Sequence, residues 1–390
     1  SQDLANTVWT FARAGHSSPV LFHAIAEVVK ARLNDFNSQN LANTVWAFAT
    51  SGHASPALFD AIAQVIEVRL KEFGCQELAN TVWAFATAGH ASSALFDAIA
   101  EVAKARLKDF NSQALANTVW AFCVLDLHAD LFCSRQFLEL VESRVADMEP
   151  KHLAQLHQWQ LWQRECGLTS SLNTALCDQL LLAFTSQPVQ ISRLQRRVTH
   201  ALRAMCDEVK EETSTQLGYS LDAVVSWRGH EVAVEVDGPF HFLDRRPTGA
   251  TILKRRQLRR LTGLHLFSIP YWDSLQTQCG RLPQPAMHHQ HYSLIGSQRL
   301  QEQRTRLKDF NSQWDAQLDS QARKKYLQQG LDAALEKKSR QHVVTLHGDD
   351  FRLLGVKELE KKLTILGLKN SGEEPDLVAR LECFLAEHIV

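Results

Sequence analysis

A unit of 37 residues repeats along the N-terminal part of this 390-residue chain. The hexapeptide Leu-Ala-Asn-Thr-Val-Trp occurs four times, and its last residue is in turn Trp9, Trp46, Trp83 and Trp120. A period of this length is typical of solenoids, in which each unit packs against its neighbours and one core runs through the stack. The repeat therefore restricts this part of the chain to a stacked architecture, and we predict an α-solenoid over residues 1–190.

Each repeat has the pattern of a helical hairpin. In the second repeat, a first helix over residues 41–51 ends at Gly52, and a second helix over about residues 56–73 has Ser55 as its N-cap. Residues 153–159 resemble a degenerate fifth unit, which we expect to cap the array because terminal repeats are often atypical.

The first helix of each repeat has two faces of different composition. At about 100° per residue, one side collects apolar residues, which in the second repeat are Leu41, Ala42, Val45, Trp46, Phe48 and Ala49. The other side carries a row that we call the stripe, formed by Asn43, Ala47 and Thr50, and at equivalent positions by Asn6, Thr10 and Arg13, by Asn80, Ala84 and Thr87, and by Asn117, Ala121 and Val124. The tryptophans are assigned to contacts between repeats rather than to base stacking. The stripe is either a solvated face or part of a concave surface that binds an extended ligand.

The unit Leu-Ala-Asn-Thr-Val-Trp-Ala-Phe-Ala resembles the helical-hairpin repeats of organellar RNA-binding proteins of the octotricopeptide class, over about residues 1–146. In related arrays two or three side chains of each repeat bind one RNA base. The resemblance implies contact with single-stranded RNA, and near-identical stripes imply a repetitive target. The stripe residues that we predict to contact RNA are Asn6, Arg13, Asn43, Thr50, Asn80, Thr87 and Asn117. The alternative is a scaffold whose solenoid binds a protein.

A change of period marks a second domain, residues 191–275. Residues 192 to about 213 carry apolar residues at three- and four-residue spacing, which predicts a helix. Residues 219–227 and 231–237 then alternate between apolar and polar residues, which is typical of strands with one buried face. We therefore predict a helix that leads directly into two strands.

The two strands are predicted to form a tight hairpin. With residues 228–229 as the turn, Trp227 pairs with His230, and counting back places Asp222 opposite Glu235. One face of this hairpin is then core and is formed by Leu221, Ala223, Val225, Val232, Val234 and Val236. The other face carries the carboxylates of Asp222, Glu235 and Asp237.

A basic segment follows the hairpin. Residues 245–250 are predicted as a loop, residues 251–262 as a helix and residues 264–270 as a third strand. Because Lys and Arg replace the counterions of phosphates, this segment favours contact with the RNA backbone. The residues predicted to make it are Arg245, Arg246, Lys254, Arg255, Arg256, Arg259 and Arg260. A solvated helix face is the alternative.

Short motifs in this domain resemble those of the RAP domain, a module of organellar RNA-processing proteins. They are Gly218-Tyr219-Ser220-Leu221-Asp222, Val234-Glu235-Val236-Asp237-Gly238-Pro239, His241-Phe242, Pro247-Thr248-Gly249-Ala250-Thr251, Leu253-Lys254-Arg255-Arg256 and Pro270-Tyr271-Trp272. RAP domains are similar to the α/β core of restriction endonucleases. The resemblance implies a restriction-endonuclease-like fold, a role in RNA processing, stability or translation, and location in a mitochondrion or plastid.

The three carboxylates allow two interpretations. In the first, they hold Mg²⁺ in an endoribonuclease, and the catalytic group is formed by Asp222, Glu235, Asp237, His241 as a proton carrier and Lys254 as a positive charge. In restriction-type nucleases a lysine usually stands two residues after the acidic ligand, and here Asp237 occupies that position. In the second interpretation no cofactor is needed, because the carboxylates cap backbone N–H groups or pair with Arg245, Arg246 and Arg255.

The C-terminal part completes a multidomain α and α/β fold class. We predict a polar helical linker over residues 276–345, with a weak partner-binding face over residues 299–340. Residues 346–390 are predicted as a small helix-loop-helix, because residues 366–381 resemble the SAP motif, which binds nucleic-acid backbone. Glu374 stands where a basic residue is usual in that motif, so contact with a protein is the alternative.

Composition excludes several classes of protein. The formal net charge of −1 predicts no general affinity for polyanions, so an RNA surface must be local. The 8 cysteines have no CxxC pair or metal-site spacing, which favours free thiols in a reducing compartment. No apolar run approaches the length of a membrane span. Because the chain begins at the start of a repeat and has no initiating methionine, we expect a longer protein, and no targeting peptide is recognised.

Overall fold

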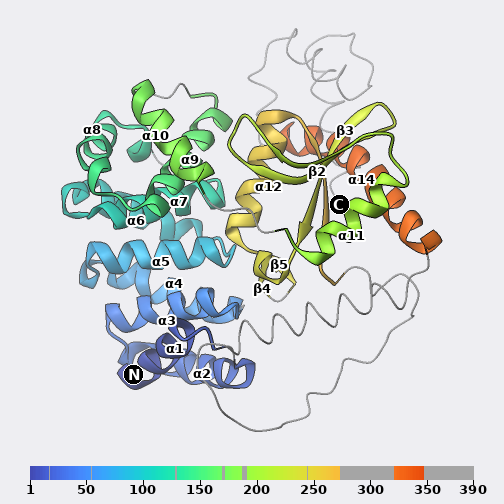
Figure 1. The fold of residues 1–390 in the computed structure, drawn as a ribbon. Helices are drawn as coiled ribbons and strands as arrows, with labels where there is room; N and C mark the ends of the chain where they lie inside the picture. Colours follow the sequence, from blue (N-terminus) through green and yellow to red (C-terminus); the bar gives the residue numbers. More distant parts are fainter. Residues whose placement is uncertain are drawn as a thin grey trace, which may run out of the picture.

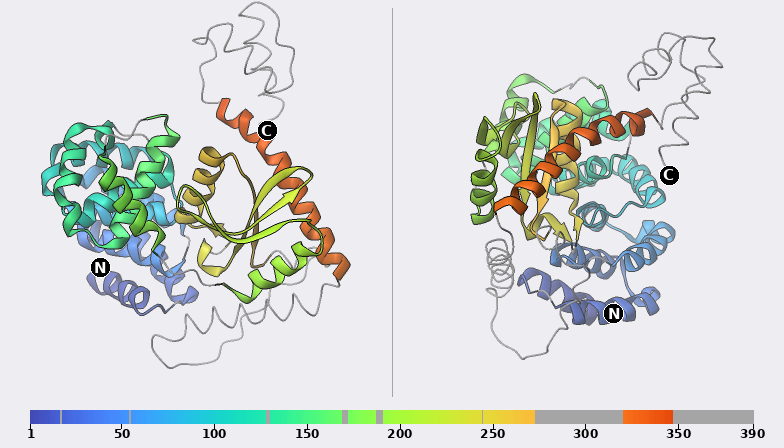
Figure 2. Two further views of the ribbon diagram at one scale, coloured as in Figure 1. Left: turned by 45° about the horizontal axis from the view of Figure 1, so that its top comes forward. Right: turned by 90° about the vertical axis from the view of Figure 1, so that its right-hand side faces the viewer.

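The computed structural model describes residues 1–272, apart from 17, 54, 128–129, 169–171, 187–190 and 244, and residues 320–346. The predicted linker up to residue 319 and the SAP-like segment from residue 347 lie outside the described residues. The described part consists of a helical array and a small mixed sheet covered by helices on both faces (Figures 1 and 2).

Helical hairpins form the array, as the repeat predicts. Their first helices pack side by side in the order α1 (Gln2–Arg13), α3 (Ser38–Ser51), α5 (Cys75–Thr87), α7 (Ser112–Leu125) and α9 (Pro150–Glu165). Their second helices form an outer row of α2 (Pro19–Ala31), α4 (Pro56–Arg69), α6 (Ser93–Ala105), α8 (Arg135–Arg144) and α10 (Thr174–Thr185). The predicted helical array is thus confirmed (Figure 1).

Capping residues account for the helix ends. Helix α3 starts earlier than predicted, because the Asn37 side chain accepts a hydrogen bond of 2.8 Å from the Asn40 N–H. It ends at Gly52, whose φ of 78° lies in the left-handed region, as predicted. Helix α4 is shorter than predicted, because a 3₁₀ turn over Leu70–Glu72 follows it. Ser55 lies at the N-cap of α4 but makes no capping hydrogen bond.

Two ladders connect successive repeats. The indoles of Trp9, Trp46, Trp83 and Trp120 follow one another along the array, with ring centroids 6.5, 6.5 and 6.4 Å apart. On the other side of each hairpin, an arginine donates to a carbonyl oxygen of the preceding repeat: Arg69 to Phe36 at 2.9 Å, Arg106 to Phe73 at 2.9 Å, and Arg144 to Phe110. The assignment of the tryptophans to contacts between repeats is therefore confirmed.

The second domain contains a sheet in the order β1-β2-β3-β6. Strands β1 (Val209–Ser214), β2 (Ser220–Trp227) and β3 (His230–Asp237) are antiparallel neighbours, and β6 (His265–Pro270) runs parallel to β3. The short pair β4 (Phe242–Leu243) and β5 (Arg246–Pro247) lies between β3 and helix α12 (Gly249–Thr262). Trp227 pairs with His230 across the turn and the pairing continues to Ala223 and Val234, so the predicted hairpin register is confirmed over these residues.

The predicted helix over residues 192–213 is wrong in its second half. Helix α11 spans Arg193–Arg203, and Val209–Ser214 is instead strand β1, which pairs with β2. The apolar spacing continues through Met205 and Val209, but the edge of β2 offers a row of backbone hydrogen-bond partners that the local pattern does not reveal. Tertiary pairing therefore overrides the helical periodicity here.

Both faces of the sheet are covered (Figure 2). On one face, α11 and α14 (Ser320–Leu346) pack on Ala223, Val225, Val232 and Val234. On the other face, α9 and α12 pack on a second apolar cluster that includes Val224, Ala233 and Leu266. Leu221, predicted to lie in the first core, belongs to this second cluster. The predicted carboxylate face is therefore an interior surface.

Helix α12 lies between the sheet and the array (Figure 1) and contacts α5, α7 and α9. A Cβ atom on Gly249 would come within 1.9 Å of the Ala86 carbonyl oxygen of α5, so the close approach at this position requires glycine. No helix in the described ranges combines the length and the apolar character that a membrane crossing needs.

Candidate functional site

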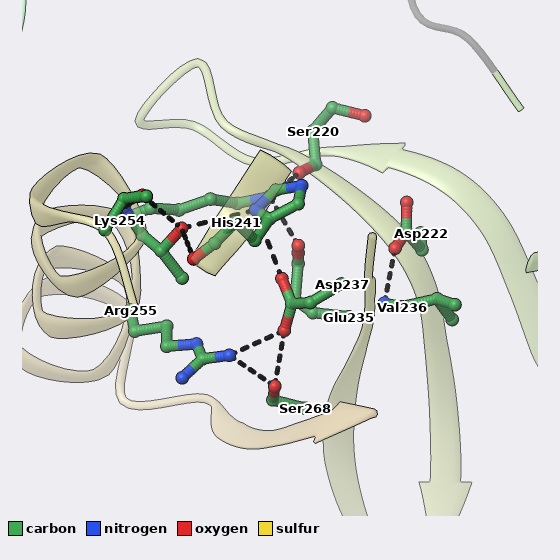
Figure 3. Close-up of polar contacts among 11 residues, drawn as sticks. Ser220, Asp222, Glu235, Val236, Asp237, His241, Lys254, Arg255 and Ser268 are labelled. Atoms are coloured by element: carbon green, nitrogen blue, oxygen red, sulfur yellow. Dashed lines mark hydrogen bonds and ion pairs between the residues drawn. The ribbon is translucent and has the colours of Figure 1, made fainter. Parts of the chain in front are cut away.

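The predicted acidic residues meet under α12, at the end of β3 (Figure 3). Glu235 is 4% exposed and Asp237 is 2% exposed. They are on the sheet face that α12 covers, so the alternation of β3 and the packing of α12 bury them together. The convergence was predicted from the strand register, whereas their burial was not.

Lys254 of α12 pairs with Glu235. Its Nζ lies 2.6 Å from Glu235 Oε2 and donates a second hydrogen bond, of 2.8 Å, to the carbonyl oxygen of Ser220. The other carboxylate oxygen of Glu235, Oε1, is buried and has no hydrogen-bond partner among the described residues. The predicted displaced positive charge is therefore present, and it neutralises Glu235.

Asp237 is the most fully bonded of the three carboxylates. Its Oδ2 pairs with Arg255 Nη2 at 2.6 Å and accepts a hydrogen bond from the Ser268 hydroxyl. Its Oδ1 lies 3.3 Å from His241 Nδ1, and the same ring nitrogen is 3.3 Å from Thr251 Oγ1. The predicted pairing of a carboxylate with an arginine is therefore present between Asp237 and Arg255.

Asp222 follows a different pattern from the predicted one. The backbone pairing of β2 with β3 ends at Ala223 and Val234. Asp222 lies beyond this pairing, and its Oδ2 accepts a 2.6 Å hydrogen bond from the Val236 N–H. Its carboxylate therefore caps a backbone group of the neighbouring strand, as the second interpretation of the acidic residues expects.

Burial controls the ionisation of this cluster. It raises the pKa of Glu235 to about 7, against the opposing effect of Lys254. It raises the pKa of Asp222 to about 6, although the Val236 N–H and Lys254 act in the other direction. It lowers the pKa of His241, which Asp237 opposes. Glu235 and Asp222 therefore titrate closer to neutral pH than ordinary carboxyl groups.

The residues of this cluster do not fit Mg²⁺. No group of three or more His, Cys, Asp or Glu side chains in the described ranges is arranged to hold a metal ion. Each of the three carboxylates is already bound to a protein donor, namely the Val236 N–H, Lys254 and Arg255. Mg²⁺ requires near-octahedral oxygen ligands, and these are not available in this geometry.

The basic residues of α12 are bound largely within the protein. Arg256 Nε lies 3.1 Å from Glu165 Oε1, and its Nη atoms donate to the last carbonyl groups of α7, those of Val124 at 2.9 Å and Cys123. Arg260 Nη1 lies 2.8 Å from Asp126 Oδ2. Of the basic residues predicted to contact RNA, Lys254, Arg255, Arg256 and Arg260 therefore form ion pairs inside the protein.

Three predicted RNA-contacting arginines have no carboxylate partner in the described part of the chain. Arg259 is half-buried, and burial together with nearby Arg255 lowers its pKa. Arg245 and Arg246 are exposed on and beside β5. The structure does not bring these two to the acidic cluster, so the predicted pairing with Asp222, Glu235 or Asp237 is wrong for them.

The stripe becomes progressively covered along the array. Asn6 and Arg13 of α1 are exposed, whereas the equivalents Asn43 and Thr50 in α3, and Asn80 and Thr87 in α5, are half-buried. Asn117 in α7 is buried, and its Oδ1 accepts a 3.1 Å hydrogen bond from Gln155. Val124 lies against Gly249 of α12. Within the stripe, Ala47 and Ala84 are buried, as are the hydroxyl oxygens of Thr50 and Thr87. The asparagine side chains are thus accessible on α1, α3 and α5 and buried on α7.

Several residues around the acidic cluster and helix α12 were not predicted from the sequence. Ser268 and Thr251 hold Asp237 and His241, and Gln257 connects α12 to Tyr219 and to the carbonyl of Gln158. The parallel pairing of β3 with β6 places Ser268 beside Glu235, and no local signal shows that pairing. The sequence gives a partial indication for Gln155 and Gln158 of α9, because they replace the Asn and the Trp of the repeat in its degenerate fifth unit.

Residues 1–150 match the family model of the RNA-editing substrate-binding complex 6 protein. The match extends from α1 to the start of α9 and stops before the sheet domain. No curated protein matches the chain. The similarity therefore concerns the helical array.

Proposed function

We propose that this chain is an RNA-binding protein of RNA processing and that the open stripe contacts single-stranded RNA. The observation that carries this proposal is the repetition of Asn6, Asn43 and Asn80 on α1, α3 and α5, at equivalent positions that stay accessible. These amides lie in the segment that is similar to the RNA-editing substrate-binding complex 6 protein. Amide groups at a regular spacing suit hydrogen bonds to successive unstacked bases.

The sheet domain contributes RNA-backbone contacts in this proposal. Arg245, Arg246 and Arg259 supply its cations, since the other basic residues of α12 are occupied by carboxylates. The RAP-like motifs and a restriction-endonuclease-like fold remain the interpretation that we propose for this domain. By the same similarity to an RNA-editing complex we propose a mitochondrial location and protein partners, whereas nothing supports a plastid.

Binding without cleavage fits the acidic cluster best. Lys254 and Arg255 neutralise Glu235 and Asp237, and Asp222 bonds to backbone, so the carboxylates are engaged within the sheet domain. We derive no step through Mg²⁺. A double variant, D222A/E235A, is expected to leave any RNA cleavage by the preparation unchanged.

The test of the proposed function is binding of a fluorescein-labelled single-stranded RNA by the full chain. We expect the affinity to fall steeply between about 50 and 200 mM salt, because phosphate binding releases counterions. The triple variant N6A/N43A/N80A should lose about 10-fold or more in affinity, since each lost hydrogen bond is worth roughly 1 kcal/mol. Binding that is absent or insensitive to salt would favour the protein scaffold.

A matched control uses exposed polar residues away from the stripe. Asn34, Gln64 and Gln136 are exposed and lie outside the first helices of the repeats. The triple variant N34A/Q64A/Q136A should bind RNA like the wild type. If both triple variants lose affinity equally, the stripe is not the RNA surface.

A further inference from the structure

Phe240 is exposed in a position where the fold does not require it. Its side chain is 58% exposed, and it is the one aromatic residue among the exposed large apolar side chains of the described ranges. It follows Gly238 and Pro239 at the carboxyl end of β3. In open α/β sheets, ligands bind outside the carboxyl ends of the strands, so this is the edge at which an exposed ring is most informative.

The loop that carries Phe240 is stiff. Pro239 and Phe242 on either side are buried. The His241 N–H donates to the Gly238 carbonyl at 3.1 Å, and the His241 carbonyl accepts from the Thr248 N–H at 2.9 Å. The ring is therefore presented by a loop that is tied down at both ends, which lowers the entropy that binding would cost.

Further aromatic rings lie at the same edge of the sheet. Because β3 and β6 are parallel, their carboxyl ends meet, and the Tyr271 N–H donates to the Asp237 carbonyl at 3.0 Å. Trp272 packs edge-on against Phe242, with ring centroids 4.2 Å apart. Tyr271 and Trp272 are both half-exposed. The edge thus combines accessible rings from two loops.

Positive charge is available beside these rings. Phe242 and Leu243 of β4 pair with Pro247 and Arg246 of β5, so Arg245 and Arg246 are in the hairpin that directly follows the Phe240 turn. Both arginines are exposed and have no carboxylate partner in the described ranges. Exposed aromatic rings next to unpaired cations are the features by which proteins bind single-stranded nucleic acids.

This edge is also next to the open part of the array. The Pro247 carbonyl oxygen of β5 lies 3.6 Å from the position that a Cβ atom on Gly89 would take, just after α5. Figure 1 shows β4 and β5 beside the repeats of α3 and α5. The hairpin that follows Phe240 in the chain therefore lies next to the C-terminal end of α5.

We propose that Phe240 stacks on an unpaired base of single-stranded RNA, while Arg245 and Arg246 bind the flanking phosphates. The proposal rests on the proposed RNA-binding function and adds a specific nucleotide site to it. Neither the strand pattern nor the basic helix pointed to Phe240, because its exposure depends on how the loop is folded.

The test compares full-length variants for binding to a 20-nucleotide oligouridylate. F240A should weaken binding by about 5- to 100-fold, which corresponds to the loss of one base–aromatic stack. F240L keeps an apolar side chain without a π face and should be as weak as F240A. F240W restores a ring and should bind within about twofold of the wild type.

Two controls separate stacking from charge. V68A changes a valine that is exposed on α4 and should bind like the wild type. R245A/R246A should lower the slope of log affinity against log salt by about 2, whereas F240A should leave that slope unchanged. Duplex RNA, whose bases are stacked internally, should bind F240A and wild type equally.

The outcomes distinguish this site from the proposed function. A wild type that does not bind oligouridylate overturns the proposed function and this site with it. A wild type that binds, together with F240A and F240L variants of unchanged affinity, overturns the Phe240 site alone. Equal losses in F240A and F240W would also overturn it, since a ring at this position would then not suffice.

Discussion

Helices α3 and α7 have almost the same sequence but different surroundings. Both contain Leu-Ala-Asn-Thr-Val-Trp-Ala-Phe. In α3, Asn43 and Trp46 are half-exposed, whereas in α7 Asn117 is buried and Trp120 is 6% exposed. Gln155 and Gln158 of α9 bond to these two α7 side chains, and α12 covers the end of the helix. One repeat sequence thus serves as an open surface at one end of the array and as a docking surface at the other.

The difference shows that position in the stack decides what a repeat residue does. The stripe asparagines of α1, α3 and α5 stay accessible, while Asn117 and Val124 of α7 contact α9 and α12. Arg256 is the clearest docking residue, since it bonds to α7 and α9 at once. Four predictions follow the contrast between the open and the covered repeats.

The largest effect is expected at the covered end. R256A should lower the free energy of unfolding by about 3–5 kcal/mol, because it removes the nearest cation of the buried Glu165 carboxylate and leaves only Arg260 at 3.7 Å. R13A at the open end should cost at most about 1 kcal/mol, since Arg13 is exposed and contributes a cation–π contact with Trp9. Urea unfolding of both variants measures this contrast, and equal losses would show that the two ends do not differ.

The tryptophan ladder gives a second contrast. W120A should cost about 3–5 kcal/mol, because it removes a buried indole and its 2.8 Å hydrogen bond to Gln158. W46A should cost roughly half as much, since its indole is already partly solvated. Thermal unfolding monitored by circular dichroism provides the comparison. A larger loss in W46A would mean that the tryptophan ladder contributes more to stability than the packing of the sheet domain on the array.

The acidic cluster should make the stability of the sheet domain depend on pH. Glu235, whose folded pKa of about 7 is above its ordinary value of 4.5, binds more protons when folded, so stability should fall as pH rises from about 5 to 7.5. The fall should be on the order of 2–3 kcal/mol from this group, with a smaller part from Asp222 below about pH 6.

The E235Q variant tests this assignment, because a glutamine does not titrate. Its urea midpoint should change less between pH 5 and pH 7.5 than that of the wild type. E27Q, which removes an exposed carboxylate of α2 in the array, is the matched control and should keep the wild-type pH dependence. A pH profile of E235Q that parallels the wild type would contradict the assignment to Glu235.

The smallest effect concerns the stripe itself. N117A should cost roughly 1 kcal/mol of stability, because it leaves the amide of Gln155 without its partner, and it should leave RNA affinity unchanged. N43A should have the opposite profile, with RNA affinity reduced and the unfolding midpoint kept. If N117A reduces RNA affinity as much as N43A, the α7 stripe is not closed to the ligand.

The local architecture of this protein was predictable because it depends on short-range patterns. The 37-residue spacing of Trp9, Trp46, Trp83 and Trp120 determined the helical hairpins and their stacking. The alternation on either side of residues 228–229 determined the register of the β2–β3 hairpin and brought the acidic residues to one face. Both patterns are periodic in the sequence, so they can be read without knowledge of the tertiary structure.

Long-range packing escaped prediction, and it redefined the site. Strand β1 was predicted as helix because its apolar spacing continues that of α11, and its pairing with β2 is a tertiary contact. The basic helix was predicted as an RNA surface from its charge alone, whereas Lys254 and Arg255 meet buried carboxylates and Arg256 meets the array. The charge of a residue does not show whether that residue pairs with a ligand or with another part of the chain.

The sequence by itself determined the repeat, the two helical layers, the hairpin register and the gathering of Asp222, Glu235 and Asp237. The tertiary structure decided which repeats stay open, which arginines of the described ranges have no carboxylate partner and that Phe240 is exposed. The physical reason is that periodicity specifies which face of a helix or strand is buried, whereas the neighbour that buries it can be distant in the sequence, as Arg256 and Glu165 show with a separation of 91.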